Sequence, residues 1–243
     1  MPDTGGCWRA AAAVVVLLAA GCEGRLVSRQ AEMRLGAESA RVIERRYPVC
    51  EDAELQWLVE RLGRQVAQHC GRPDVDFTFR VLDVRDVNAL SVPGYVYVNR
   101  GLINMVNADP QELAGVIAHE IAHTTERHVA KQMERIYGAS FLLQVFSSGR
   151  ATIDTVAEVA VNLALSGNSR QDERAADAQA LRFMSRAGYD PEGLVRFFER
   201  LKKQTGDSQG PIRYFASHPP TADRIARARE LIRVEGLAAG GRE

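Results

Sequence analysis

The sequence predicts an α+β domain that is mostly helical and carries a small β-sheet. Apolar residues recur at helical spacing over most of the chain. Two short stretches, 77–83 and 95–98, alternate instead and are rich in β-branched and aromatic residues, which is typical of strands. The chain has 243 residues, of which 46% are hydrophobic, and this is enough to bury one core. No internal repeat or low-complexity linker divides it.

The first residues are predicted to be an export signal rather than part of the fold. The apolar run 10–20 is too short to span a bilayer, and it leads into Leu-Ala-Ala-Gly-Cys at 18–22. This ending resembles a bacterial lipobox, so we expect a signal peptide over 1–21 and acylation of Cys22. Glu23 then favours delivery to the outer membrane, by resemblance to the sorting of Gram-negative lipoproteins. An ordinary cleaved signal is the alternative.

The remaining elements follow from periodicity and from cap residues. Asp109 and Pro110 start a helix well, because Asp is a good N-cap and Pro suits the first helical position. The apolar residues that recur at helical spacing along the helix 51–69 are expected to lie in the core, and Trp57 is expected to lie there with them. We expect helices over 26–47, 51–69, 109 to about 135, a buried or membrane-surface pair within 136–169, and then 170–186, 190–203 and 221–234.

Two cysteines, Cys50 and Cys70, remain after the signal. A straight helix between them would separate their ends by about 30 Å at 1.5 Å per residue. A disulfide needs Cα atoms within about 7 Å. We therefore expect no bridge between them.

The clearest chemistry lies in the H-E-x-x-H motif at 119–123. His119 and His123 are four residues apart, so they share one helix face and can take adjacent corners of a Zn²⁺ tetrahedron. Glu120 lies about 100° round the helix and can reach a water beside the metal rather than the metal itself. This is the position of the general base in a zinc hydrolase.

A catalytic zinc needs a third protein ligand from elsewhere in the chain. Glu126 and Val129 stand where a metzincin would have Gly and His, so that class is excluded. A later helix offers Glu173, and Asp177 on the same face could accept a hydrogen bond from the far nitrogen of a ligating His. Asp172 is the rival ligand. We expect one Zn²⁺ per chain.

These motifs resemble those of the zinc endopeptidases of the HtpX, BepA and LoiP type, which are zincin-like (gluzincin) enzymes related to the CAAX prenyl endopeptidases. The resemblance runs from about Asp52 to Ile232. It is greatest to the LoiP type, because this sequence is also predicted to be a short exported lipoprotein. It rests on Asn88-Ala89, Pro93-Gly94, Gly101-Leu102, Glu112-Leu113-Ala114, Arg127-His128, Ser169-Arg170, Glu173, Ala176-Asp177, Ala187-Gly188-Tyr189, Ser217-His218-Pro219 and Arg224. Domain boundaries follow as 22–50 for the anchor and lead-in helix, 51–236 for the zinc metallopeptidase domain and 237–243 for a tail.

The resemblance also implies a substrate-binding strand. The strand near 95–98 is expected to be the sheet edge on which an extended peptide pairs, framed by Asn88, Pro93, Gly94 and Tyr95. Tyr95 departs from the family pattern, in which a second Gly is common. An ordinary hairpin is the alternative.

Three further residues have open or minor roles. His218 could donate to the oxyanion, act as a fourth zinc ligand that keeps the site latent, or be a surface residue. Arg224 could reach the substrate or simply be solvated. His128 stands about 140° round a continuous helix from His123, so we predict that it is structural and outside the metal site.

The resemblance implies a zinc-dependent endopeptidase in which Glu120 is the base and the substrates are unfolded or misassembled envelope proteins. Acylated Cys22 would hold it at the bacterial outer membrane, facing the periplasm. A latent or non-proteolytic chaperone or assembly factor is one alternative, and a hydrolase of cell-wall peptides is another. Lys plus Arg and Asp plus Glu are both 31, so no basic footprint indicates nucleic acid.

Overall fold

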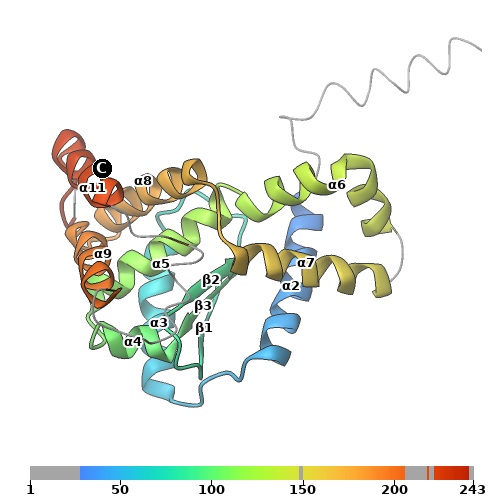
Figure 1. Ribbon diagram of the computed structural model, residues 1–243, viewed down its shortest axis with the longest axis horizontal. Helices are drawn as coiled ribbons and strands as arrows, with labels where there is room; N and C mark the ends of the chain where they lie inside the picture. The colour runs from blue at the N-terminus through green and yellow to red at the C-terminus, as the bar shows by residue number, and fades with distance from the viewer. Residues whose placement is uncertain (1–27, 148–149, 206–217, 219–221, 241–243) are drawn as a thin grey trace, which may run out of the picture.

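The computed structural model describes residues 28–147, 150–205, 218 and 222–240 (Figure 1). The predicted signal peptide and Cys22 lie outside these residues. Most of the described chain is helical, and the helices are α2 (Arg29–Arg46), α3 (Ala53–Ala67), α4 (Arg100–Met105), α5 (Pro110–Thr125), α6 (His128–Ser147), α7 (Arg150–Ser166), α8 (Arg170–Arg186), α9 (Glu192–Thr205) and α11 (Ala222–Glu235). The predicted α+β class with a small sheet is confirmed.

The sheet has three strands in the order β1 (Thr78–Leu82), β3 (Tyr95–Asn99), β2 (Ala89–Val92). β1 pairs with β3 in parallel, and β2 pairs with β3 antiparallel. The prediction that 95–98 forms the free edge is therefore wrong, because β3 is the central strand and Tyr95 has partners on both sides. The edge that runs beside α5 is β2, which Asn88 precedes and Pro93 follows.

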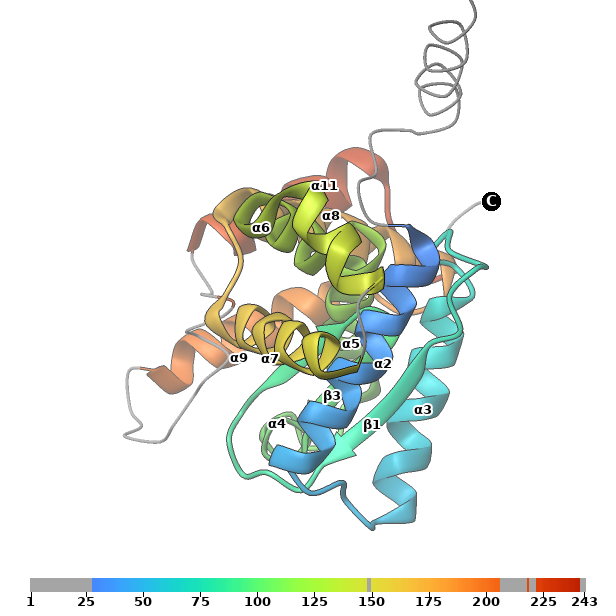
Figure 2. The same cartoon turned by 90° about the vertical axis from the view of Figure 1, so that its right-hand side faces the viewer.

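Helices cover both faces of this sheet, as Figure 2 shows. On one face, α3 and α5 pack against residues such as Phe79 and Val96 in the larger hydrophobic core. On the other face, α2 and α7 pack against Leu90 and Tyr97. The lead-in helix α2 is thus part of the folded unit. Its Gly36 allows the close approach, because a Cβ there would lie 1.8 Å from the carbonyl oxygen of Pro93.

Helix α5 is at the centre of the helical part and is surrounded by α3, α8 and α9. Asp109 caps it as predicted, accepting hydrogen bonds from the backbone N–H groups of Gln111 and Glu112, which is worth about 1 kcal/mol. Ala176 and Ala180 of α8 are fully buried and let that helix lie close to α5. The packing of α8 on α5 brings the two chemical motifs together.

Two expectations about these helices are wrong. The helix from 109 does not continue to 135: α5 ends at Thr125, Arg127 takes a left-handed φ of 58°, and α6 starts at His128. Trp57 is not in the core, because 64% of its surface is exposed and the guanidinium of Arg61 lies over its ring. The side chains that α3 buries are Val59, Leu62 and Val66, with Leu55 and Leu58 half-buried against the same core.

The predicted pair within 136–169 corresponds to α6 and α7, and Gly138 kinks α6 with a φ of 70°. None of the helices among the described residues combines the length and apolar character that a membrane crossing requires. The thiols of Cys50 and Cys70 are both free and buried.

Candidate zinc site

Helix α5 places the H-E-x-x-H motif deep inside the protein. His119, Glu120 and His123 are 0%, 1% and 4% exposed. The Nε2 atoms of the two histidines face each other at 3.0 Å. The predicted sharing of one face by the two imidazoles is thus present in the structure.

Helix α8 brings Glu173 against both imidazoles. Its Oε2 lies 3.4 Å from Nε2 of His119, and its Oε1 lies 3.4 Å from Nε2 of His123. Ligand atoms on a zinc tetrahedron with bonds of about 2.0–2.1 Å are separated by roughly 3.3–3.4 Å. The three side chains therefore have the spacing that one zinc ion requires.

His218 completes a group of four. Its Nδ1 lies 2.9 Å from Oε1 of Glu173 and 3.3 Å from Nε2 of His119. Ligand atoms of the four residues all lie within 4.8 Å of one another, and the cluster fits one zinc. His218 is only 2% exposed, so the interpretation of His218 as a surface residue is wrong.

The electrostatics of this cluster favour a cation. Burial disfavours a charged Glu173, but His218 and His119 hold the pKa of its carboxyl well below its usual range. Burial alone would lower the pKa of His119, yet its bonds to Asp177 and Glu173 raise it to about 9. Carboxylates that stay ionised in a buried pocket need positive charge, and a divalent cation among these nitrogen and oxygen donors supplies it.

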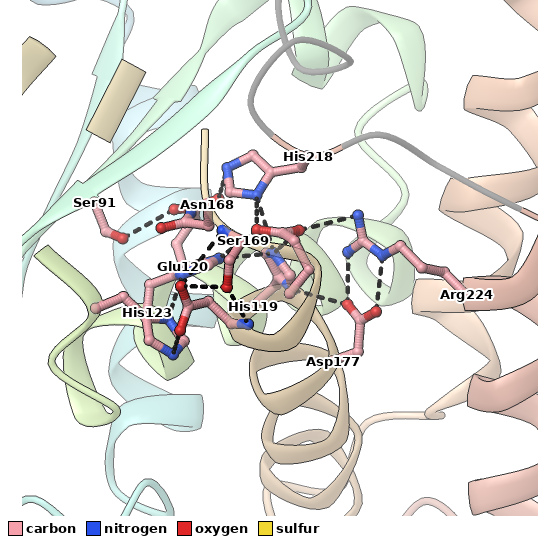
Figure 3. A network of polar contacts seen from close by, with 12 residues as sticks. Ser91, His119, Glu120, His123, Asn168, Ser169, Asp177, His218 and Arg224 are labelled. Carbon is pink, nitrogen blue, oxygen red and sulfur yellow. Dashed lines mark hydrogen bonds and ion pairs between the residues drawn. The ribbon is translucent and has the colours of Figure 1, made fainter. Parts of the chain in front are cut away.

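A second layer of side chains holds the donors. Oδ1 of Asp177 lies 3.0 Å from Nδ1 of His119, on the side away from Nε2. Arg224, buried over the ring of Phe198, donates from Nε and Nη2 to Asp177 at 2.8 and 2.6 Å, and its Nη1 lies 3.0 Å from Oε2 of Glu173 (Figure 3). Arg224 therefore contacts the acidic residues of the site and is not a solvated residue.

The other side of the cluster is built differently. Nδ1 of His123 lies 2.7 Å from Nδ1 of His128. Nε2 of His128 lies 3.5 Å from Oδ1 of Asp172. Burial, together with the charge of His123, lowers the pKa of His128 to about 3, so its ring is neutral. Asp172, the predicted rival ligand, is not in the four-residue cluster.

Glu120 lies next to the cluster without joining it. Its Oε2 accepts a hydrogen bond of 2.9 Å from Oγ of Ser91 on the edge strand β2 (Figure 3). Its Oε1 lies 3.6 Å from Nε2 of His218 and accepts no hydrogen bond among the described residues. A buried carboxylate oxygen without a donor, beside a metal cluster, leaves room for the proton of a water molecule.

Sequence reasoning missed Ser91 and the contact between His123 and His128. Ser91 had no local pattern, since its position depends on how β2 lies along α5. His128 was misplaced because a continuous helix was assumed. The adjacent Thr124 and Thr125 were an available signal, because β-branched residues are weak helix formers.

The remaining predicted substrate residues do not enter the cluster. Asn88 is buried just before β2, and Pro93 and Gly94 form the turn between β2 and β3, with φ of Gly94 at 81°. Pro93 lines a small pocket together with Ser91 and His123, so this turn lies close to the four-residue cluster.

The fold and the cluster together define an H-E-x-x-H zinc metallopeptidase with a carboxylate supplied by a later helix. The model of Peptidase family M48 matches residues 52–232, and the chain belongs to this family.

Several curated proteins are similar to this chain. The beta-barrel assembly-enhancing protease of Escherichia coli (strain K12) is 27% identical over 217 residues, which cover 85% of this chain and 45% of that protein. The putative beta-barrel assembly-enhancing protease of Vibrio cholerae is 28% identical over 86% of this chain and 46% of that protein. The metalloprotease LoiP of Escherichia coli is 27% identical over 65% of this chain and 64% of that protein.

These comparisons correct one expectation. LoiP and the beta-barrel assembly-enhancing proteases have nearly the same identity to this chain, so a special likeness to the LoiP type is not favoured. The chain spans about half the length of the first of these relatives.

Proposed function

We propose that this protein is a zinc-dependent endopeptidase that degrades unfolded or misassembled proteins of the bacterial envelope. The observation that carries the proposal is the position of Glu120. Its carboxylate is buried beside the cluster of His119, His123 and Glu173, and one of its oxygens has no hydrogen-bond donor among the residues that the structure describes. Family membership and the complete motif support the same chemistry.

His119, His123 and Glu173 would hold the zinc. When bound, the metal supplies Lewis acidity, which lowers the pKa of a water molecule and polarises a peptide carbonyl. Glu120 accepts the proton of the attacking water and later gives it to the amine that leaves. Ser91 orients the Glu120 carboxylate through its hydrogen bond, and His218 Nε2 can donate to the oxyanion that develops.

The proposed substrate class has three kinds of support. The residues at 18–22 resemble a lipobox, which would attach the protein through Cys22 to the outer membrane and face it to the periplasm. Two relatives carry a name that connects them with β-barrel assembly. Strand pairing of an extended peptide needs little side-chain selectivity, which suits unfolded substrates.

The direct test is digestion of casein by the zinc-loaded chain, with the Glu120→Gln variant as the comparison. We expect the variant to bind zinc and to cleave at least about 100-fold more slowly, since a positioned base contributes roughly 10²–10⁴-fold. Absence of casein cleavage by a zinc-loaded wild type, together with cleavage of muropeptides, would replace the proposal by a cell-wall hydrolase.

A second candidate, a latent enzyme that needs a trigger, is favoured by the burial of the site. Glu120, His218 and every residue of β2 are buried, so no extended peptide reaches the strand without movement. His218 Nδ1 lies among the other donor atoms and can act as a fourth ligand. The chain would then be inactive until His218 withdraws, and could serve in the meantime as a non-proteolytic assembly factor.

The variant His218→Ala separates these roles. A latent enzyme becomes faster on casein when the fourth ligand is removed. An enzyme that uses His218 to stabilise the oxyanion becomes slower, by roughly 10²-fold or more. The same assay on Glu120→Gln/His218→Ala checks that any released activity still depends on Glu120.

The lipid anchor has its own test. Labelling cells with a radioactive fatty acid should mark the wild type and not the Cys22→Ala variant, and the variant should lose membrane association. Wild-type protein without label would show an ordinary cleaved signal instead.

A further inference from the structure

We propose that His128 is a positioning residue that orients the zinc ligand His123, and that Asp172 in turn holds His128. The inference rests on the ligand role of His123 in the proposed function. It assigns a role to His128, which the sequence analysis interpreted as structural, and to Asp172, which it considered as a rival zinc ligand.

The contact between the two rings is short and buried. Nδ1 of His123 and Nδ1 of His128 lie 2.7 Å apart, and the side chains are only 4% and 2% exposed. The rings meet edge to face, with centroids 4.8 Å apart and planes inclined by 68°. Nitrogen atoms at this distance share a hydrogen bond, because two lone pairs facing each other at 2.7 Å would repel.

The proton positions follow from the ligand role. If His123 offers Nε2 to the metal, its Nδ1 carries the hydrogen and donates to His128. Nδ1 of His128 must then be an acceptor, so its hydrogen lies on Nε2. That N–H faces Oδ1 of Asp172 at 3.5 Å, which is longer than a hydrogen bond but close enough for the carboxylate charge to favour this tautomer.

Asp172 is itself held firmly. It forms a capping box at the start of α8, in which Oγ of Ser169 donates to Oδ2 of Asp172 at 2.7 Å and the backbone N–H of Asp172 donates to Ser169. Glu173, the proposed third ligand, is the next residue along this helix. The first turn of α8 thus fixes both the carboxylate of the metal site and the partner of His128.

The break between α5 and α6 is what brings His128 to His123. Residues five apart on a continuous helix point about 140° away from each other. The left-handed conformation of Arg127 breaks the helix between α5 and α6. The buried Glu32 of α2 accepts a hydrogen bond of 3.0 Å from Nε of Arg127. A non-glycine residue in this conformation is uncommon, and here its side chain is held by an ion pair with the lead-in helix.

The test is the zinc dissociation constant of the full chain, measured by competition with a chromogenic chelator. His128→Phe keeps a ring but has no acceptor, and His128→Asn places an amide oxygen where Nδ1 accepts. We expect His128→Phe to weaken zinc binding about 10–100-fold, the range for removing a partner of a ligating His. His128→Asn should restore most of this loss, and Asp172→Asn should weaken binding by a few-fold.

His69→Phe is the matched control, since it makes the same substitution at a histidine outside the site, and it should bind zinc like the wild type. His123→Phe tests the ligand role itself and needs no peptidase activity. Equal zinc affinity in wild type and in a folded His128→Phe would overturn the proposal, as would unchanged affinity in His123→Phe. If His128→Phe does not fold, equal weakening by His128→Asn and by a folded His128→Leu would also contradict it.

Discussion

His119 and His123 stand on the same face of α5, yet the side chains behind them have opposite character. His119 is backed by the carboxylate of Asp177, which Arg224 holds with two hydrogen bonds. His123 is backed by His128, a neutral ring, with the carboxylate of Asp172 one step further out. The difference shows that one helical spacing can place two equivalent ligands, while distant segments decide how strongly each is held.

The largest effect is expected at Glu173, the proposed zinc ligand that lies against both histidines. Glu173→Gln removes the charge that lies 3.4 Å from each Nε2 atom. Zinc affinity should fall well beyond the roughly 10–100-fold typical of an outer partner. Chelator competition measures this, and a fall of less than about tenfold would show that Glu173 is not a ligand.

Support for the His123 side extends to the lead-in helix. Glu32→Ala leaves the buried Arg127 without one of its partners, and breaking a buried ion pair from one side costs about 3 kcal/mol. The urea unfolding midpoint of the chain should drop accordingly. Glu38→Ala, which removes only the pairing with Arg41 within α2, should change stability by less than about 1 kcal/mol.

The His119 side should be the more sensitive of the two outer layers. Asp177→Asn removes a charged acceptor that receives two hydrogen bonds from Arg224 and lies 3.0 Å from Nδ1 of His119.

 Burial disfavours the charge of Asp177, but Arg224 keeps the pKa of the Asp177 carboxyl below its usual range, so the acceptor is ionised. We expect Asp177→Asn to weaken zinc binding by close to 100-fold, the upper end for such partners, and more than His128→Phe does. Asp223→Asn, an exposed control at the start of α11, should have no effect; a smaller loss in Asp177→Asn than in His128→Phe would reverse the comparison.

The smallest effect concerns the base rather than the ligands. Ser91→Ala removes the hydrogen bond to Glu120 and leaves the metal cluster untouched. A hydrogen bond to a charged group is worth about 1.5 kcal/mol, so kcat on a peptide substrate should fall roughly tenfold while zinc affinity stays the same. A change in zinc affinity without a change in kcat would place Ser91 in the metal site instead.

The sequence predicted well what depends on local spacing. His119, Glu120 and His123 have a fixed relation on any helix, and the Asp109 cap placed the start of α5 correctly. Glu173 was found because it shares a helix face with Asp177. The limits of α8 were predicted to the residue.

What the sequence could not give depends on how distant segments meet. β3 was taken as the edge strand because the chain order of the strands does not reveal their order in the sheet. The turn at Arg127 has no Gly to announce it, so His128 was placed on the wrong side of a helix that does not continue. Trp57 belongs to an amphipathic helix, but its side chain is on the solvent-exposed face, where the guanidinium of Arg61 lies over its ring.

The most direct test of the central claim is an anomalous difference map, recorded at the zinc absorption edge, from crystals of the zinc-loaded chain. We predict one strong peak per chain, in contact with Nε2 of His119, Nε2 of His123 and the carboxylate of Glu173. A peak at Asp172 in place of Glu173, or no peak between the two histidines, would contradict the claim.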